Sequence, residues 1–212
     1  MENVLIIGAN GGTGRKIAQR LKSHADYAPI AMIRKEEQKE YFDQRGIKTV
    51  IGDLEEDFRK CYKGIDKVIF AAGSGGSTGD DKTKAIDELG AKNAIQIAED
   101  KEIKKFVLLS SMGTDQPDSI PGLKVYLKAK KASEEFLEKM DVNYTIIQPG
   151  GLKNDEGTGK IQAQTKIKEF GTIPRADVAY ALVVSLNDNI AHNKAAQIIA
   201  GDQEVEKAMG AI

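Results

Sequence analysis

The chain has 212 residues, a formal net charge of −1 at pH 7, 41% hydrophobic residues and 30% charged residues, which is ordinary for a soluble globular protein. Acidic and basic residues are interspersed, so we expect no clustered basic face of the kind that binds nucleic acid. No apolar run approaches the roughly 18 residues needed to span a membrane, so no membrane partner is expected.

Histidine and cysteine are scarce. The two histidines, His24 and His192, lie far apart, and Cys61 is the single cysteine, so we expect neither a metal site nor an internal disulfide. The first predicted strand starts near the N-terminus without a basic stretch before it, unlike a signal peptide. These features predict a cytoplasmic location.

Short apolar segments alternate with helical segments along the chain. The predicted strands cover residues 4–7, 30–33, 48–51, 68–72, 106–109 and 144–147, and the predicted helices cover residues 12–22, 35–45, 82–99 and 125–140. Near-continuous apolar strands between helices are typical of a parallel sheet that is covered on both faces. The sequence therefore predicts an α/β fold of the Rossmann type, a doubly wound parallel sheet with helices on both faces.

The length favours one NAD(P)-binding domain over residues 1–212. The segment after Pro149 is short, so we expect it to add a small C-terminal lid region, with substrate-side elements at about 150–175 and 187–212. A glycine-rich segment at 73–79 and a polar one at 150–159 follow predicted strands. Open parallel sheets bind ligands at the carboxyl ends of their strands, so both segments are candidate ligand loops, with simple connectors as the alternative.

A glycine-rich loop joins the first predicted strand to the first predicted helix. Its G-x-x-G-x-x-G pattern allows a tight turn and lets a pyrophosphate approach bare backbone N–H groups at a helix N-terminus. A glycine turn that only serves packing is the alternative interpretation. The position at the first strand–helix junction favours a dinucleotide site, formed by Gly8, Asn10, Gly11, Gly12, Thr13 and Gly14.

The end of the second predicted strand bears on which dinucleotide is bound. NAD-binding proteins place a carboxylate there, about 20 residues after the loop, whereas this chain has Arg34. A guanidinium donates a forked, charge-assisted pair of hydrogen bonds to a 2′-phosphate, so Arg34 favours NADP, with NAD, or an arginine that is merely exposed, as the alternative. Asp53, before Leu54, either meets the adenine amine or caps a helix.

A tyrosine and a lysine four residues apart share one face of the helix predicted after the fifth strand. They are Tyr126 and Lys130. A lysine beside a tyrosine lowers the pKa of the phenol, which can then exchange the proton that accompanies hydride transfer. Ser110 or Ser111, at the end of the fifth strand, supplies a hydroxyl for a substrate carbonyl. The alternative is a half-buried tyrosine and a solvent lysine.

These motifs together resemble the short-chain dehydrogenase/reductase superfamily, and the stretches 106–111, 126–130 and 144–150 are similar in order and spacing to its atypical branch. That branch comprises NmrA-like and epimerase/dehydratase-like NAD(P)-binding proteins. Superfamily members are often dimers, which makes a homodimer a candidate assembly. Beyond the first loop, the resemblance implies cofactor contacts from Arg34, Asp53, Leu54, Ala71, Ala72, Gly73, Lys130, Pro149 and Gly150.

We therefore expect an NADP-dependent oxidoreductase that reduces a small carbonyl, quinone or flavin-like acceptor. With a carbonyl, Ser110 or Ser111 would orient the oxygen, Tyr126 would donate the proton, and Lys130 would hold the ribose. With a flavin or quinone, positioning of the cofactor alone can suffice. The alternatives are an NAD(P)-binding redox-sensing regulator without turnover and an epimerase/dehydratase-like enzyme, although the short C-terminal part can hardly build a sugar-nucleotide pocket.

Overall fold

A single sheet runs through the molecule. The computed structural model describes residues 1–75, 79–120 and 122–212, and within them nine strands form the sheet in the order β11-β8-β10-β6-β5-β4-β1-β2-β3. Neighbours from β3 to β10 pair in parallel, whereas β8 is antiparallel to both β10 and β11. The strands are β1 (Glu2–Ile7), β2 (Tyr27–Ile33), β3 (Lys48–Ile51), β4 (Lys67–Phe70), β5 (Lys105–Leu109), β6 (Tyr144–Pro149), β8 (Lys160–Gln164), β10 (Lys194–Ala200) and β11 (Gln203–Glu204).

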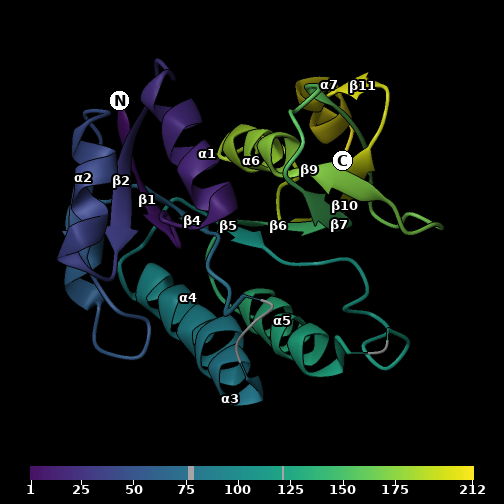
Figure 1. Cartoon of the computed structure of the whole chain (residues 1–212), viewed down its shortest axis with the longest axis horizontal. Coiled ribbons are helices and arrows are strands. Elements are labelled where there is room, and N and C mark those ends of the chain that lie inside the picture. Colours follow the sequence, from purple (N-terminus) through teal and green to yellow (C-terminus); the bar gives the residue numbers. More distant parts are fainter. Residues whose placement is uncertain (76–78, 121) are drawn as a thin grey trace.

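Helices cover both faces of this sheet. Figure 1 shows α1, α6 and α7 above the sheet and α3, α4 and α5 below it. The arrangement confirms the predicted Rossmann-type fold, with an antiparallel extension at one edge. No helix within the described ranges is both long enough and apolar enough to cross a membrane. The helices are α1 (Gly12–Lys22), α2 (Lys39–Asp43), α3 (Asp80–Thr83), the π-helical segment η3 (Lys84–Gly90), α4 (Ala91–Asp100), α5 (Lys124–Leu137), α6 (Arg175–Val184) and α7 (Val205–Gly210).

Side chains along the buried strands alternate between two hydrophobic clusters. In β1, Val4 and Ile6 join the cluster that contains α1 and α6, whereas Leu5 and Ile7 join the cluster that contains α4. All four side chains are fully buried, and each contributes about 1.5–3 kcal/mol relative to exposure. A strand buried on both faces needs apolar residues at every position, which explains the continuous apolar run seen in the sequence.

Strand β1 lies where the strand order reverses. It pairs with β2 on one side and with β4 on the other, and the connections that leave these strands cover opposite faces. A crevice therefore opens beyond the carboxyl ends of β1 and β4, the usual ligand position in open α/β sheets. The first turn into this crevice uses Gly8 with a φ of 84°, which favours glycine because it has no Cβ.

The helix predicted for residues 35–45 forms only in part. A 3₁₀ turn, η1 (Glu36–Gln38), precedes the short helix α2. The Gln38 side-chain oxygen accepts the backbone N–H groups of Arg34 at 2.9 Å and Lys35 at 3.2 Å, so a side chain closes this turn. Only Phe42 of the segment is buried, and so little apolar burial cannot stabilise a longer helix.

One part of the C-terminal region follows the carboxyl end of β6, and the other part joins the main sheet. Within 150–175, β7 (Gly151–Lys153) and β9 (Thr172–Pro174) form a separate two-stranded parallel sheet directly after β6. Residues 187–212, which we expected on the substrate side, instead form β10, β11 and α7. A parallel partner for β6 was missed because the segment 194–200 reads as mixed rather than continuously apolar.

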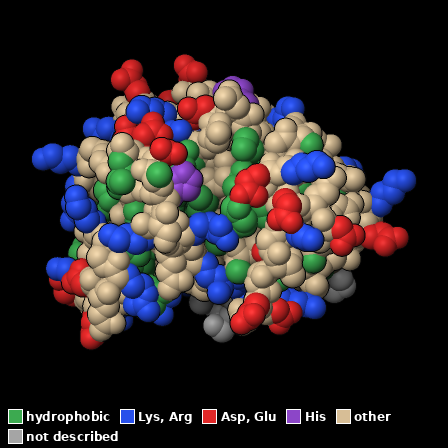
Figure 2. Space-filling model, turned by 90° about the horizontal axis from the view of Figure 1, so that it is seen from above, with side chains coloured by type: hydrophobic (Ala, Val, Ile, Leu, Met, Phe, Trp, Pro, Cys, Tyr) green, Lys and Arg blue, Asp and Glu red, His purple; other side chains and the backbone are tan. Residues whose placement is uncertain are grey.

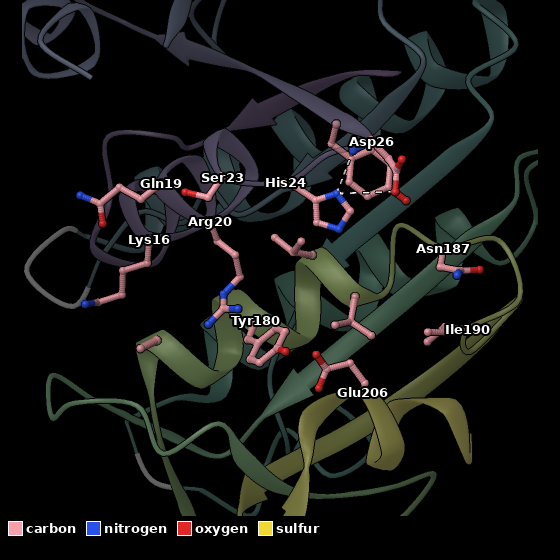
Figure 3. A pocket seen from close by; sticks show the side chains of 14 residues that line it. Lys16, Gln19, Arg20, Ser23, His24, Asp26, Tyr180, Asn187, Ile190 and Glu206 are labelled. Atoms are coloured by element: carbon pink, nitrogen blue, oxygen red, sulfur yellow. Dashed lines mark hydrogen bonds and ion pairs between the residues drawn. The ribbon is translucent and has the colours of Figure 1, made fainter. Parts of the chain in front are cut away.

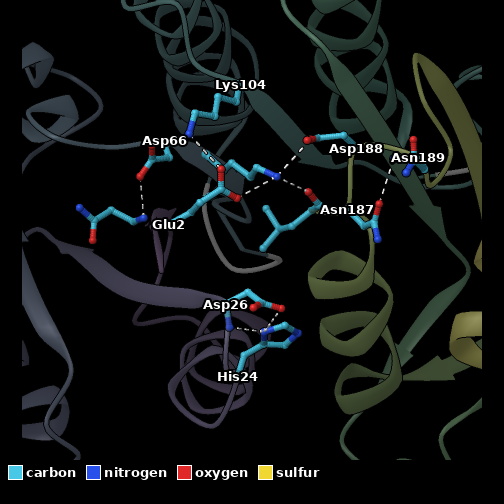
Figure 4. Close-up of polar contacts among 11 residues, drawn as sticks. Glu2, His24, Asp26, Asp66, Lys104, Asn187, Asp188 and Asn189 are labelled. Carbon is cyan, nitrogen blue, oxygen red and sulfur yellow. Dashed lines mark hydrogen bonds and ion pairs between the residues drawn. The ribbon is translucent and has the colours of Figure 1, made fainter.

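A cluster of ion pairs lies at the amino ends of the parallel strands, opposite the crevice (Figure 4). Lys67 is only 4% exposed, and its Nζ lies 3.0 Å from Glu2 Oε2 and 3.1 Å from Asp188 Oδ1. Lys104 Nζ lies 3.0 Å from Glu2 Oε1 and 2.9 Å from Asp66 Oδ1. These contacts join the start of β1 and β4 to the segment after α6 and to Lys104, directly before β5, so they stabilise the fold at this end of the strands.

Replacing Gly14 with alanine will destabilise the folded chain. The new methyl group would lie 2.2 Å from the Gly8 carbonyl oxygen and 2.8 Å from Ala9 Cα. Overpacking costs roughly 1–3 kcal/mol, and here the obstacle is backbone that cannot rotate away. Urea unfolding without added ligand measures the loss.

Gly210→Ala is the matched control, because in the described ranges no atom beyond its chain neighbours and the backbone of its own helix lies within 4 Å of the added Cβ. Its free energy of unfolding should stay within about 0.5 kcal/mol of the parent value. Equal losses in the two variants would contradict the packing explanation.

Candidate functional site

Two adjoining cavities follow the carboxyl ends of the parallel strands. The β1–β3 cavity, about 470 Å³, lies beyond β1, β2 and β3, and the β4–β5 cavity, about 730 Å³, lies beyond β4 and β5. Both are of the size that small-molecule and cofactor sites have. They lie side by side, because each is lined by Gly11, Ala72, Gly73 and Ser74.

The β1–β3 cavity gathers the residues predicted for one half of a dinucleotide. The structure thus brings together the start of the glycine loop and residues that follow three other strands. Lys82, which the sequence did not single out, also lines the cavity, and its Nζ pairs with Glu55 at 2.6 Å. The predicted residues found in this lining are Gly8, Asn10, Gly11, Arg34, Asp53, Leu54, Ala72 and Gly73.

Arg34 presents an exposed guanidinium to the β1–β3 cavity. In the part of the chain that the structure describes, this guanidinium has no hydrogen bond and no ion pair, while the Arg34 backbone N–H donates to Gln38. The acidic residue of the lining is Asp53, whose Oδ1 accepts the Glu55 N–H at 3.0 Å. Asp53 therefore closes a turn and lines the cavity, but no helix starts directly after it, so the helix-cap alternative is wrong and the adenine contact stays a prediction.

Asn10 is held within the loop by a neighbouring arginine. Its Oδ1 accepts from Arg15 Nε at 3.1 Å and Nη2 at 2.6 Å. The Arg15 guanidinium also stacks 4.0 Å from the centre of the Tyr41 ring. Arg15 is thus already engaged by the protein, and it stabilises the loop conformation rather than lining either cavity.

The start of α1 suits an anion. Its N-cap, Gly11, makes no side-chain capping bond, and the first turn contains no acidic residue. The first backbone N–H groups of a helix have no partner within it, and they carry partial positive charge. Gly11, Gly12 and Thr13 line the β4–β5 cavity, so this end of the helix borders it.

The β4–β5 cavity brings together the predicted reactive groups. Its walls include apolar side chains with substantial exposure, namely Leu123 at 42%, Val125 at 40% and Leu152 at 38%. The predicted residues in this lining are Gly11, Gly12, Thr13, Ala71, Ala72, Gly73, Ser110, Tyr126 and Lys130. Of the glycine-rich candidate loop at 73–79, residues 76–78 lie outside the described residues.

Four predicted site residues lie behind the walls of the cavities instead of in them. Gly14 packs on Gly8, and the Ser111 hydroxyl donates to the Met112 carbonyl oxygen at 3.1 Å. Pro149 accepts the Met112 N–H at 2.9 Å, and Gly150 donates to Ile198 at 3.0 Å. The geometry therefore distinguishes Ser110, which lines the cavity, from Ser111, which does not; the other residues behind the walls are Gly14, Pro149 and Gly150.

Lys130 is buried between the cavity and η3. It is 3% exposed, and its Nζ lies 3.1 Å from Asp87 Oδ1 and 3.2 Å from the Leu109 carbonyl oxygen. The centre of the Tyr126 ring is 5.7 Å away. Burial opposes the charge on Lys130, but Tyr126 and Asp87 outweigh it and raise the pKa of the lysine. Lys130 is therefore a cation at neutral pH.

Asp87 is a site residue that the sequence analysis missed. Its side chain is fully buried in η3, and its Oδ2 accepts the Ser74 N–H at 2.9 Å. Asp87 thereby joins Lys130 to the loop that both cavities share. The available signal was an acidic residue at helical spacing from Ala91 and Ala94, on a face that is otherwise apolar.

Arg175 adds a second cation that the sequence analysis did not assign. It begins α6 and lines the β4–β5 cavity, with its Nη1 donating to Asn154 Oδ1 at 2.7 Å. A Cβ on Gly12 would lie 3.3 Å from Arg175 Cδ, so the arginine side chain lies directly against the glycine loop. This position was unpredictable, because α6 and the loop are far apart in the sequence.

A separate groove of about 790 Å³ lies between α1 and α6. Figure 2 shows hydrophobic side chains in a hollow on this face, with charged side chains around it, and Figure 3 shows the lining. Arg20 stacks 3.5 Å from the centre of the Tyr180 ring, and His24 Nδ1 accepts the Asp26 N–H at 3.2 Å. The groove shares no lining residue with the strand-end cavities, and none of the predicted reactive groups lies in it.

Comparison with known proteins also indicates a dinucleotide-binding protein. A family model described as NAD(P)H-binding matches residues 8–189. A Bacillus subtilis protein named uncharacterized sugar epimerase YhfK is 39% identical over 210 residues, which cover 97% of this chain and 98% of the relative. A solved structure from Bacillus halodurans, named as an NAD-dependent epimerase/dehydratase, is 38% identical and has a TM-score of 0.96 over the whole of both chains. Sanguinarine reductase from Eschscholzia californica is 29% identical, with 91% of this chain and 86% of the relative covered.

Replacing Asp87 with alanine will destabilise the protein strongly, because Lys130 then remains buried without its carboxylate. Breaking a buried ion pair from one side costs roughly 3–5 kcal/mol. Urea unfolding measures the loss. The matched control is Glu88→Ala in the same segment, which removes an ion pair to Lys92 whose side chains are 24% and 30% exposed; a loss of about 1 kcal/mol or less is expected.

The double variant Asp87→Ala/Lys130→Met removes both charges and should recover much of the stability lost by Asp87→Ala. A double variant as unstable as the sum of the two single variants would show that the charges are not coupled.

Proposed function

This chain belongs to the NAD(P)H-binding family, and we propose that it is an NADP-dependent reductase of a small carbonyl, quinone or flavin-like acceptor. Membership of the family supports a bound dinucleotide and an oxidoreductase or epimerase type of chemistry. The observation that carries the reductase proposal is the position of Ser110, Tyr126 and Lys130, which line one cavity directly beside the glycine loop.

The two cavities fit the two halves of a dinucleotide. The uncapped N-terminus of α1 offers backbone N–H donors where the cavities meet, which suits the pyrophosphate. The adenosine half would then lie in the β1–β3 cavity against Asp53 and Leu54, and the nicotinamide half in the β4–β5 cavity. When bound, the reduced nicotinamide supplies the hydride.

Arg34 supports NADP as the preferred dinucleotide. Its guanidinium has no protein partner among the described residues, and it reaches the β1–β3 cavity from the end of β2. A 2′-phosphate would provide a charge-assisted, forked partner for such a group. The carboxylate that selects the free ribose hydroxyl in NAD-binding proteins is missing from this strand end.

In the carbonyl reaction, the protein would supply a proton and hold the oxygen. Tyr126 donates its phenolic proton to the carbonyl oxygen as the hydride reaches the carbon. The Lys130 ammonium, 5.7 Å from the ring centre and kept charged by Asp87, stabilises the phenolate that remains. Ser110 orients the substrate oxygen from the end of β5.

The apolar wall favours an acceptor with an apolar or aromatic body. Leu123, Val125 and Leu152 are unusually exposed for such side chains, and all three border the β4–β5 cavity. Covering them with a ligand would contribute about 25 cal/mol for each Å² removed from water. The relation to sanguinarine reductase, named for an organic acceptor, agrees with this preference.

An epimerase/dehydratase-like reaction is the second candidate, because the names of the Bacillus subtilis relative and of the Bacillus halodurans structure point to it. Tyr126 and Lys130 could serve it equally well. The difference lies in the substrate, since turnover of a sugar derivative without net consumption of NADPH would identify this reaction.

Arg34→Ala should weaken NADPH binding by about 10- to 100-fold, the effect of losing a charge-assisted hydrogen bond of roughly 1.5–3 kcal/mol. NADH binding should change little. Thermal shifts and calorimetric titrations with NADPH, NADP, NADH and NAD measure both effects. Lys48→Ala, which removes an exposed cation of β3 outside the cavities, is the control.

Equal affinities for NADH and NADPH in the parent protein would eliminate Arg34 as a selector. Failure of all four dinucleotides to shift the melting temperature would reject the proposed function.

Tyr126→Phe should lower kcat for carbonyl acceptors by about 10²- to 10⁴-fold, because it removes the proton donor and leaves the ring in place. The dissociation constant for NADPH should remain nearly unchanged. Stopped-flow oxidation of NADPH with aldehyde, quinone and flavin acceptors measures the effect, and Tyr180→Phe on α6 is the control. Undiminished carbonyl reduction by Tyr126→Phe would refute the assignment, whereas retained quinone or flavin reduction alone would identify the acceptor class.

A further inference from the structure

A carboxyl group lies buried one turn beyond Lys130. Tyr126, Lys130 and Glu134 follow each other at intervals of four residues on α5, so they share one face of the helix. Glu134 is 7% exposed. The proposed reaction uses the first two residues of this stripe and leaves the third without a role.

The partners of Glu134 are polar but uncharged. Gln148 Nε2, from β6, donates to Glu134 Oε1 at 2.8 Å and to Thr114 Oγ1 at 3.0 Å. No lysine or arginine in the described ranges forms an ion pair with Glu134. The charged groups that face it are on its own helix, namely Lys130 in the preceding turn and Glu138 in the next.

Burial raises the pKa of Glu134, and the hydrogen-bonding groups of Ser110, Gln148 and Thr114 oppose that rise. Carboxylates that are buried without a cation pay a desolvation penalty on ionisation, so they hold their proton to higher pH than exposed ones do. Gln148 is decisive here, because an amide stabilises the carboxylate far less than a guanidinium or ammonium at the same position would.

Ser110 connects this carboxyl with the reaction cavity. The residue lines the β4–β5 cavity, yet its Oγ atom is buried and has no hydrogen bond of ordinary geometry among the described residues. The hydroxyl instead lies near enough to Glu134 to help stabilise the carboxylate. Buried hydroxyls normally have a partner, and the buried Ser110 hydroxyl has Glu134 as its hydrogen-bonding neighbour, in a residue that also lines the cavity.

We propose that Glu134 is a positioning residue for Ser110: the ionised carboxylate holds the serine hydroxyl inside the protein, and the protonated carboxyl releases it to the acceptor. This inference rests on the proposed reductase function. It assigns Glu134, Gln148 and Thr114 a part in that function which no sequence motif indicated.

The physical reason lies in the direction of the serine hydrogen bond. A carboxylate only accepts hydrogen bonds, so Ser110 must point its proton at an ionised Glu134 and has none to offer a carbonyl oxygen. A protonated Glu134 can itself donate to Ser110, which leaves the serine proton free for the cavity. Hydrogen bonds to a charged carboxylate are also about twice as strong, so ionisation restrains the hydroxyl further.

A pH dependence follows, with a definite sign. Since Ser110 is available when Glu134 is protonated, kcat for a carbonyl acceptor should be high below the pKa of Glu134 and should fall as pH rises through it. We expect a fall of about tenfold, the value of one transition-state hydrogen bond of about 1.4 kcal/mol. The dissociation constant for NADPH should not follow this profile, because Glu134 contacts neither cavity.

The experiment compares kcat-against-pH profiles of the parent with three variants. In Glu134→Gln the amide donates to Ser110 at every pH, so this fall should disappear. Gln148→Arg supplies a cation and should move the fall to lower pH, whereas Gln148→Met removes the amide donors and should move it to higher pH. Glu135→Gln, which removes an exposed carboxylate of α5 that pairs with Lys131, is the matched control and should keep the parent profile.

A second measurement does not depend on turnover. Infrared difference spectra across pH, with Glu134→Gln used to identify the band, report ionisation of the Glu134 carboxyl in the whole protein. Ser110→Ala should raise the pKa of Glu134, because the carboxylate loses a hydrogen-bond donor. An unchanged carboxyl titration in Ser110→Ala, or a Glu134→Gln profile identical with that of the parent, would overturn the proposal.

The two measurements separate the two levels of inference. A parent protein that reduces no acceptor, while the carboxyl titration shifts in Ser110→Ala, would reject the reductase function and retain the contact between Glu134 and Ser110. A normal reductase with an unshifted titration would reject the positioning role alone.

Discussion

The close approach of the first loop to β1 and β4 is the constraint on which the rest of the structure depends. A Cβ on Gly8 would lie 2.5 Å from the Ala72 backbone nitrogen, and one on Gly14 would lie 2.2 Å from the Gly8 carbonyl oxygen. Only this absence of side chains lets α1 begin directly over the point where the strand order reverses. The uncapped N-terminus of α1, the shared wall of the two cavities and the position of Arg175 against Gly12 all follow from that contact.

Helix α5 places three polar side chains in surroundings of different electrostatic character. Tyr126 lines the open cavity, Lys130 is buried beside a carboxylate, and Glu134 is buried beside neutral hydrogen-bonding groups. Burial disfavours the charge of both groups, but Tyr126 and Asp87 outweigh it at Lys130 and raise the pKa of the lysine, whereas burial prevails at Glu134 and raises the pKa of the glutamate. A single helical stripe thus carries a fixed charge and a titratable one, and Ser110 lies next to the second.

The two strand-end cavities differ in the kind of groups that line them. In the β1–β3 cavity the loop contributes backbone and small side chains, with Arg34 and Asp53 at the far end. In the β4–β5 cavity the groups that could act on an acceptor are side chains from β5, α5 and α6. Backbone donors tolerate many sequences as long as the glycines remain, which is consistent with a family defined by its dinucleotide. The acceptor side can diverge, because its apolar wall depends on a few exposed residues such as Leu123 and Leu152.

The sequence by itself determined the parallel strands from β1 to β6, helix α1 from Gly12 to Lys22, the glycine loop and the spacing of Tyr126 and Lys130. These features are local, since turns, periodicity and the demands of two-sided burial act over a few residues at a time. Only the tertiary structure decided that Asp87 forms an ion pair with Lys130 and that Arg175 lies against Gly12. It also decided that Ser110 rather than Ser111 lines the cavity, and that 194–200 pairs with β6. Each of these depends on segments far apart in the chain, where the choice of partner is made by packing and by the cost of leaving a buried charge unpaired.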